Sequence, residues 1–243
     1  MIYNPLISII TVVYNGEKFL EQTIQSVISQ TYNNIEYIII DGGSTDGTVD
    51  IIKKYEKHLA YWVSEKDEGI YDAMNKGLKV ATGKYVAFIN ADDWYAENVL
   101  EVVAKYMQKS QADFIAGKIK IIDENTGTSV VRKSNFDEYG KNIHHQASFI
   151  KTDLIRAKPF NTKYRLAADR DMIIRVLKQE VSTLFIDVVI SNFREGGAGS
   201  DLIKYQRELF DSNRRNIGLL FALKRFVLNI TGRFLFNTLG IKR

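Results

Sequence analysis

The chain has no cysteine and only two prolines among its 243 residues. The lack of cysteine excludes a disulfide framework and a thiol nucleophile, and it suits a reducing cytoplasm. So few prolines argue against a proline-rich linker. The sequence also lacks a run of about 18 uncharged apolar residues and a basic leader at its start, so neither a membrane-spanning helix nor a signal peptide is expected.

Negative charge is missing from the C-terminal end of the chain. Residues 214–243 contain seven Lys or Arg and no Asp or Glu, although the whole chain carries a net charge of only +4. Apolar residues recur at helical spacing between these basic residues. We interpret residues 201–243 as a basic amphipathic tail that contacts the inner leaflet of a membrane. A helix docked on the body or on a second subunit stays open, whereas nucleic acid is not expected as a partner.

Strand and helix patterns alternate through the first half of the chain. Continuous apolar runs predict buried strands over residues 6–13, 35–40 and 85–90. Helical periodicity predicts helices between them, over residues 20–28, 48–58, 70–81 and 96–108. The second half is less regular and predicts a hairpin over 114–132, a strand over 148–150, a helix over 168–178 and a strand over 183–193. The pattern indicates an α/β fold with a mostly parallel sheet and flanking helices.

Two adjacent aspartates follow the strand predicted over residues 85–90, in the segment Asn90-Ala91-Asp92-Asp93. Ligands of open α/β sheets bind beyond the carboxyl ends of the strands. Paired carboxylates at such a place repel each other, and a hard divalent ion that completes its shell with phosphate oxygens would relieve the repulsion. The alternative is that one aspartate only caps the helix predicted from Ala96.

A glycine-rich segment, residues 41–48 (DGGSTDGT), follows the strand predicted over residues 35–40. Glycines let backbone N–H groups approach a ligand, and Asp41 could accept a hydrogen bond from a base or a ribose. The segment lacks the lysine of a phosphate-binding P-loop and the spaced glycines of a dinucleotide fingerprint. A polar turn between strand and helix is the alternative.

Two helix starts also carry carboxylates. In residues 67–77 (DEGIYDAMNKG), Asp72 and Lys76 are four residues apart and could form a surface ion pair. In residues 168–171 (ADRD), Asp169 or Asp171 could act as a general base. Acidic residues are also common in a first helical turn because of the helix dipole.

Together these segments resemble glycosyltransferase family 2, whose members have the glycosyltransferase-A fold. The resemblance spans roughly residues 5–200 and includes, in the family's order, segments 8–15 (SIITVVYN), 41–48, 67–77, 90–93 and 168–171. It implies one catalytic domain over residues 1–200, with a nucleotide-binding donor half over about 1–110 and an acceptor half over about 111–200. The tail over 201–243 follows this domain.

The resemblance implies a set of residues along the donor nucleotide. Thr11, Tyr14 and Glu17 would lie along the nucleotide, and Asp41 would read the edge of the base. Thr11 lies in the first predicted strand, Tyr14 and Glu17 follow that strand, and Asp41 follows the second.

The resemblance also implies residues around the donor's sugar and diphosphate. Asp72 and Asn75 would line this part of the cleft. Asp92 and Asp93 resemble the family's Asp-x-Asp element. By this analogy Asp93 ligates Mn²⁺ or Mg²⁺, and Asp92 contacts the ribose or the sugar.

Asp169 matches the family's catalytic base, which deprotonates the acceptor hydroxyl. The family commonly has Glu before this base, where this chain has Ala168, so Asp171 stays an alternative. His145 resembles a residue near the acceptor in similar enzymes, and Arg194 with residues 196–200 could form a lid over the pyrophosphate. For both, ordinary packing or a simple loop is the alternative.

The implied function is that of a cytoplasmic, inverting, metal-dependent glycosyltransferase. It would transfer a sugar, expected to come from a UDP-sugar, to a glycan or lipid-linked acceptor in surface polysaccharide synthesis. The location could be peripheral, at the cytoplasmic face of the membrane. A nucleotidyltransferase and a non-catalytic nucleotide-sugar-binding protein are the alternatives.

Overall fold

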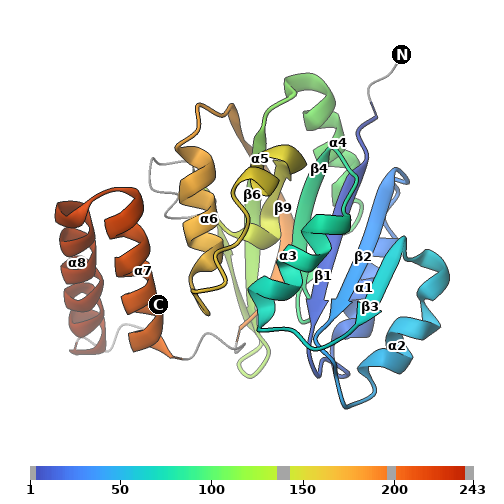
Figure 1. Ribbon diagram of the computed structural model, residues 1–243, viewed down its shortest axis with the longest axis horizontal. Coiled ribbons are helices and arrows are strands. Elements are labelled where there is room, and N and C mark those ends of the chain that lie inside the picture. The colour runs from blue at the N-terminus through green and yellow to red at the C-terminus, as the bar shows by residue number, and fades with distance from the viewer. Residues whose placement is uncertain (1–3, 136–142, 196–200, 239–243) are drawn as a thin grey trace.

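The computed structural model describes residues 4–135, 143–195 and 201–238, with side chains described up to residue 229. A mixed sheet of nine strands forms the centre of the molecule (Figure 1). Its strand order is β3-β2-β1-β4-β8-β6-β9-β5, and β7 pairs with β6 beside this path. The α/β architecture with flanking helices that the sequence predicted is therefore confirmed.

The N-terminal half of the sheet is parallel. Strands β1, β2 and β4 are rich in apolar β-branched residues and are buried on both faces, as central parallel strands usually are. The parallel strands are β1 (Ile7–Val13), β2 (Ile35–Asp41), β3 (Tyr61–Ser64) and β4 (Tyr85–Asn90). Because they run the same way, the segments after β1, β2 and β4 emerge at one edge of the sheet.

The C-terminal half of the sheet is mixed. Strand β8 runs antiparallel to β4 and to β6, whereas β9 runs parallel to β6. The short β5 and the hairpin strand β7 add antiparallel edges. These strands are β5 (Trp94–Tyr95), β6 (Phe114–Asp123), β7 (Thr128–Arg132), β8 (Ser148–Lys151) and β9 (Thr183–Arg194).

Helices cover both faces of the sheet. One core cluster joins the sheet to α1 (Leu20–Ile28), α2 (Thr48–Lys54) and α4 (Val99–Ser110). The other joins it to α3 (Ile70–Val80), α5 (Thr152–Ala157) and α6 (Ala168–Leu177). Two single 3₁₀ turns, η1 (Glu56–His58) and η2 (His145–Ala147), complete these connections. The site segments therefore extend from a sheet that is packed on both sides.

Two helices follow the sheet at the C-terminal end, α7 (Leu202–Asn216) and α8 (Leu219–Thr238). Helix α7 lies beside α6, and α8 lies outside α7, farthest from the sheet (Figure 1). The rings of Phe210 and Phe226 meet edge to face between α7 and α8, with centroids 5.6 Å apart. Within the described part of the chain, every helix is too short or too polar to span a bilayer.

Helix α3 packs closely on the sheet at Gly77. A Cβ at this position would lie 2.6 Å from Cγ2 of Ile10 in β1, so the side chain or the helix would have to shift. Alanine normally stabilises a helix relative to glycine. We nevertheless expect Gly77→Ala to lower the free energy of unfolding by about 1–3 kcal/mol through overpacking.

Chemical denaturation of Gly77→Ala and of a control, Lys79→Ala on the exposed side of α3, measures this effect. The control should stay within about 0.5 kcal/mol of the wild type. A Gly77→Ala protein as stable as the wild type, or more stable, would contradict the close packing.

Candidate functional site

A cleft of about 940 Å³ opens where β1 and β4 end. Residues 12–16 and 90–92 line it from these two strands, and the start of α3 lines it at residues 69–71. Residues 165, 166 and 169 line it from the start of α6 and the segment before it. The volume is in the range of small-molecule sites. The cleft therefore unites parts of four of the five segments singled out in the sequence, and residues 41–48 are not in its lining.

Asp92 and Asp93 lie in different surroundings. Asp92 lines the cleft, whereas the side chain of Asp93 is fully buried. The backbone N–H of Arg194 donates to Oδ1 of Asp93 at 3.2 Å, and no hydrogen bond reaches the other carboxylate oxygen from any described residue. Burial raises the pKa of Asp92. Burial and the neighbouring Asp92 charge raise the pKa of Asp93 well above its usual range.

This pair fits a divalent cation only if a ligand completes the coordination. Among the described residues, no group of three His, Asp or Glu side chains is arranged to hold a metal ion. Mg²⁺ is commonly bound by one or two carboxylates together with substrate phosphates. The unpaired buried oxygen of Asp93 and the cleft-facing Asp92 are suitable oxygen donors.

Arg194 supports the aspartate segment and is almost buried. Its guanidinium stacks on the Phe19 ring at 3.9 Å, and its Nε donates to the backbone oxygen of Asp92 at 3.3 Å. Nη2 donates to Gln22 at 2.8 Å, and the guanidinium also pairs with Glu124. The glycine loop expected to act with it, residues 196–200, lies outside the described residues.

Asp169 lies in the first turn of α6 and reaches the cleft. Tyr71 donates its hydroxyl to Oδ1 at 3.2 Å, and Nδ1 of His145 is 3.2 Å from Oδ2. Burial acts to raise the pKa of Asp169, but His145 and the neighbouring Arg170 outweigh it and keep the pKa below its usual value. The carboxylate is therefore ionised at neutral pH and about a quarter exposed, which are the properties of a general base.

The neighbouring carboxylate, Asp171, is turned away from the cleft. Its oxygens accept from Nε of Arg175 at 2.7 Å, from the Ser212 hydroxyl at 2.8 Å and from Nδ2 of Asn216 at 2.8 Å. Its side chain is 4% exposed. Of the two carboxylates in this turn, the structure thus places only Asp169 on the cleft wall.

Of the four residues expected along the nucleotide, one lines the cleft and three lie outside its lining. Tyr14 lines the cleft and is 64% exposed. Thr11 is buried and shares a 3.1 Å hydrogen bond with a tyrosine hydroxyl inside the sheet. Asp41 is buried and accepts from Ser44 N and from the Ser64 hydroxyl, so it organises the glycine turn. Glu17 accepts from the backbone of that turn, at residue 47.

The two residues expected near the donor sugar lie outside the cleft lining. Asp72 accepts from the backbone N–H of Glu68 at 3.2 Å. Asn75 exchanges two hydrogen bonds with the backbone of Phe160, at 2.8 and 3.0 Å. Asn75 therefore ties α3 to the segment between α5 and α6.

Arg165 lines the cleft although the sequence analysis did not single it out. Asp67, from the segment 67–77, and Gln146, next to His145, also line it. Gly69 has φ = +118°, which favours glycine, and a Cβ there would lie 2.8 Å from Nη1 of Arg165. Arg165 lies in an irregular segment without periodicity or motif, so the sequence carries no signal for its role.

Comparisons with known proteins identify the family and the fold of the chain. The family model for "Glycosyl transferase family 2" matches residues 8–181. The chain is similar to a "PGL/p-HBAD biosynthesis glycosyltransferase" of Mycobacterium bovis, with 31% identity over 241 residues that cover 91% of this chain and 90% of the relative.

Two solved structures share the fold at low sequence identity. S. aureus TarS in complex with UDP-GlcNAc superposes with a TM-score of 0.74 at 20% identity, covering 97% of this chain and 76% of TarS. Mannosyltransferase PcManGT from Pyrobaculum calidifontis, in complex with GDP-Man and Mn²⁺, gives 0.64 at 18% identity, covering 92% and 65%. These likenesses confirm the expected fold, and the two donors differ in both base and sugar.

The raised pKa of Asp93 predicts that the free energy of unfolding depends on pH. Because folding raises the pKa of Asp93, the unfolded chain loses this proton at lower pH than the folded chain does. Rising pH between the unfolded and folded pKa values therefore destabilises the wild type. Asp93→Asn removes this cost and should raise the free energy of unfolding near neutral pH, without metal, by about 0.5–2 kcal/mol.

Denaturation of metal-free protein at several pH values measures the difference, which should grow as the pH rises from about 4. Glu97→Gln, which removes an exposed carboxylate, is the control and should show no such growth. A difference that stays constant with pH, or a less stable Asp93→Asn protein at neutral pH, would mean that folding does not raise the pKa of Asp93.

Proposed function

Because the chain belongs to glycosyltransferase family 2, we propose that it is an inverting, metal-dependent enzyme that moves one sugar from a nucleotide-diphosphate donor to an acceptor hydroxyl. The observation that carries the proposal is that Asp92 and Asp169 line the same cleft. In this proposal Asp92 would meet the diphosphate and its cation, and the ionised Asp169 would deprotonate the acceptor hydroxyl.

The donor is proposed to be a UDP-sugar that lies across the ends of β1 and β4. The segment that includes Tyr14 would flank the nucleotide, while Thr11, Glu17 and Asp41 would hold the walls around it through the contacts described above. Asp72 and Asn75 would act in the same indirect way on the start of α3. The UDP-GlcNAc bound to TarS supports uridine, although the GDP-Man bound to PcManGT keeps guanosine as a second candidate.

The two adjacent aspartates are proposed to have roles that differ from those expected from the sequence. Asp92 would be the metal-contacting carboxylate, because it lines the cleft, and Asp93 would support it from the buried side. The Mn²⁺ in the PcManGT complex supports Mn²⁺ or Mg²⁺ as the cation. When bound, such a cation would neutralise charge on the departing nucleoside diphosphate.

Asp169 is proposed to take the proton of the acceptor hydroxyl as that oxygen attacks the anomeric carbon. Tyr71 and His145 would fix the orientation of its carboxylate, and Asp171 would have no part in the chemistry. Attack from the side opposite the leaving group inverts the anomeric carbon. Family membership favours this reaction over nucleotidyl transfer, which would release pyrophosphate.

Asp169→Asn separates catalysis from donor binding. The amide cannot accept the proton, so we expect the transfer rate to fall by about 10²–10⁴-fold while the nucleoside diphosphate still binds. Release of nucleoside diphosphate measures turnover, and a nucleotide-induced thermal shift measures binding.

Asp50→Asn, an exposed change in α2, is the matched control and should keep full activity. Unchanged turnover of Asp169→Asn would contradict the role of this base. A wild-type protein that binds nucleotide sugars and transfers none would instead support the non-catalytic alternative.

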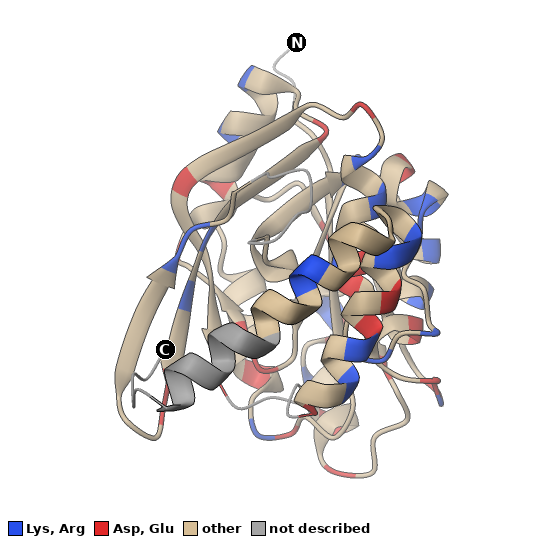
Figure 2. Cartoon of the chain, turned by 90° about the vertical axis from the view of Figure 1, so that its left-hand side faces the viewer, with Lys and Arg blue, Asp and Glu red and all other residues tan. Residues whose placement is uncertain are grey.

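The acceptor is proposed to be a glycan or lipid-linked molecule of surface polysaccharide synthesis, met at the cytoplasmic face of a membrane. The exposed side of α8 supports a lipid contact, because Leu220 is 85% exposed and Leu223 and Val227 lie near it at helical spacing. Figure 2 shows α8 across the front of the molecule, with basic and no acidic residues in its described part. Apolar and basic groups together suit an anionic bilayer surface.

Replacing Leu220 and Leu223 by glutamate tests this contact. We expect the wild type to sediment with vesicles that contain phosphatidylglycerol and the double variant to lose at least about tenfold in binding, because apolar burial is lost and negative charge is added. Val130→Glu, which also places a glutamate at an exposed apolar residue but on β7, should bind as the wild type does. Wild-type protein that does not sediment with anionic vesicles at low salt would refute the contact.

A further inference from the structure

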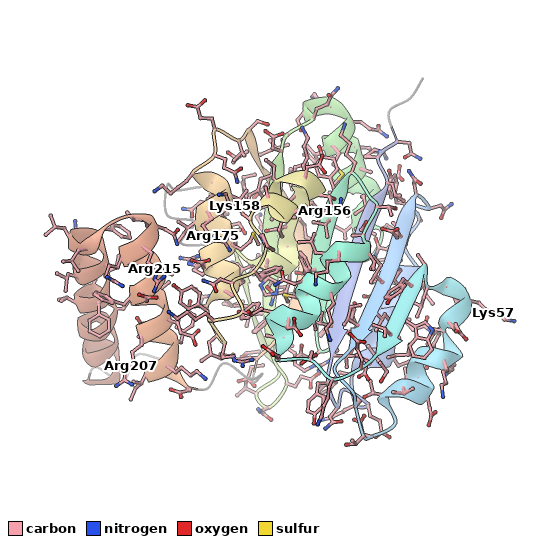
Figure 3. All side chains as sticks on the ribbon, viewed as in Figure 1. Lys57, Arg156, Lys158, Arg175, Arg207 and Arg215 are labelled. Atoms are coloured by element: carbon pink, nitrogen blue, oxygen red, sulfur yellow. The ribbon has the colours of Figure 1, made fainter. Side chains whose placement is uncertain are left out.

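One face of α7 is directed at the segment that carries the proposed base. Glu208, Asp211, Ser212 and Asn216 recur at helical spacing on this face, and all four contact α6 or the residues before it. Figure 3 shows Arg175 of α6 and Arg215 of α7 in the zone where the two helices meet. The sequence alone had assigned α7 to a tail outside the catalytic domain.

Glu208 makes an unusual set of contacts. Its Oε1 accepts from the backbone N–H of Arg165 at 3.0 Å, and its Oε2 accepts from Leu166 and Ala167 at 2.7 and 3.1 Å. One carboxylate thus holds three consecutive backbone donors in a segment without regular secondary structure. Because hydrogen bonds to a charged acceptor are stronger than neutral ones, this contact is expected to fix the segment firmly.

The held segment leads directly into the catalytic turn. Arg165 and Leu166 line the cleft, and Ala167 is the residue from which α6 begins. Ala167 has no polar side chain with which to cap the helix itself. Through the N–H of Ala167, Glu208 holds the chain just two residues before Asp169.

Helix α7 also holds the chain after the base. The Ser212 hydroxyl and Nδ2 of Asn216 both donate to the buried Oδ1 of Asp171, each at 2.8 Å. On the preceding side, the Tyr164 hydroxyl donates to Asp211 at 3.0 Å. Asp169 is therefore bracketed by α7 contacts on both sides.

We propose that Glu208 is a positioning residue for Asp169, so that α7 forms part of the catalytic unit. This inference rests on the proposed function, because it assumes that Asp169 is the base. Residues 202–216 lie beyond the region matched by the family model, which ends at residue 181. Small displacements of a base relative to its substrate reduce turnover strongly. The loops after β1 and β4, where the donor is proposed to bind, make none of these contacts with α7, so donor binding should change little.

Glu208→Gln is the direct test in the full-length protein. The amide has one acceptor oxygen where the carboxylate has two, and it turns a donor towards a backbone N–H. We expect kcat to fall by about 10–100-fold, with KM for the donor and the thermal shift by nucleoside diphosphate within about threefold of wild type. A purely structural effect would lower stability and donor binding together.

Two variants complete the experiment. Glu101→Gln makes the same chemical change on the exposed side of α4 and should leave kcat unchanged. Ser212→Ala removes one hydrogen bond from the other side of the bracket and should lower kcat by a smaller factor. This milder variant decides the matter if Glu208→Gln does not fold at the assay temperature.

The outcomes distinguish this inference from the proposed function. A wild-type protein that transfers no sugar would refute the proposed function. If the wild type is active, an undiminished kcat in folded Glu208→Gln would overturn only the role of Glu208. If Glu208→Gln does not fold, an unchanged kcat in Ser212→Ala would overturn the inference that α7 forms part of the catalytic unit. A parallel loss of nucleotide binding and kcat would also overturn it.

Discussion

The contacts of Asp169 join the parts of the molecule on which the cleft depends. Tyr71 reaches this carboxylate from α3, and His145 reaches it from the turn before β8. Asn75 adds a second link by binding the backbone before α6, at residue 160. Elements that pack on the parallel half and on the mixed half of the sheet therefore both contact the ionised side chain of Asp169. Its orientation is fixed by hydrogen bonds rather than by apolar packing, which leaves one part of the carboxylate open to the cleft.

Carboxylates outnumber guanidinium groups on the lining of the cleft. Asp67, Asp92 and Asp169 line it, and Arg165 is the cleft-lining guanidinium among the described residues. Asp93 adds a buried carboxylate whose pKa is raised by burial and by its neighbour. Close carboxylates are unfavourable in the free protein. In the proposed function, a divalent cation would offset the charge of the nearest carboxylate and, on its other side, the charge of the diphosphate that it binds. In the proposed function, the carboxylates that destabilise the free protein at the end of β4 are those that would bind the cation.

The sequence could predict the elements whose pattern is local and periodic. The helix expected over residues 70–81 is Ile70–Val80, and the strand expected over 183–193 is Thr183–Arg194. The helix expected over residues 96–108 begins later, at Val99, after Asn98 in a left-handed conformation. The different settings of the two adjacent aspartates and the contacts made by α7 depend on tertiary packing. No periodicity or motif could reveal them.

The most direct measurement of the central claim is a thermal-shift titration of the wild-type protein with nucleoside diphosphates, with and without Mn²⁺. A donor site of the proposed kind predicts stabilisation by UDP that requires the metal and disappears with a chelator. At a ligand concentration one hundred times Kd, the gain should be about 2.7 kcal/mol. Stabilisation by GDP alone would keep the site and change the base. Folded protein that no nucleoside diphosphate stabilises, with or without metal, would contradict the account.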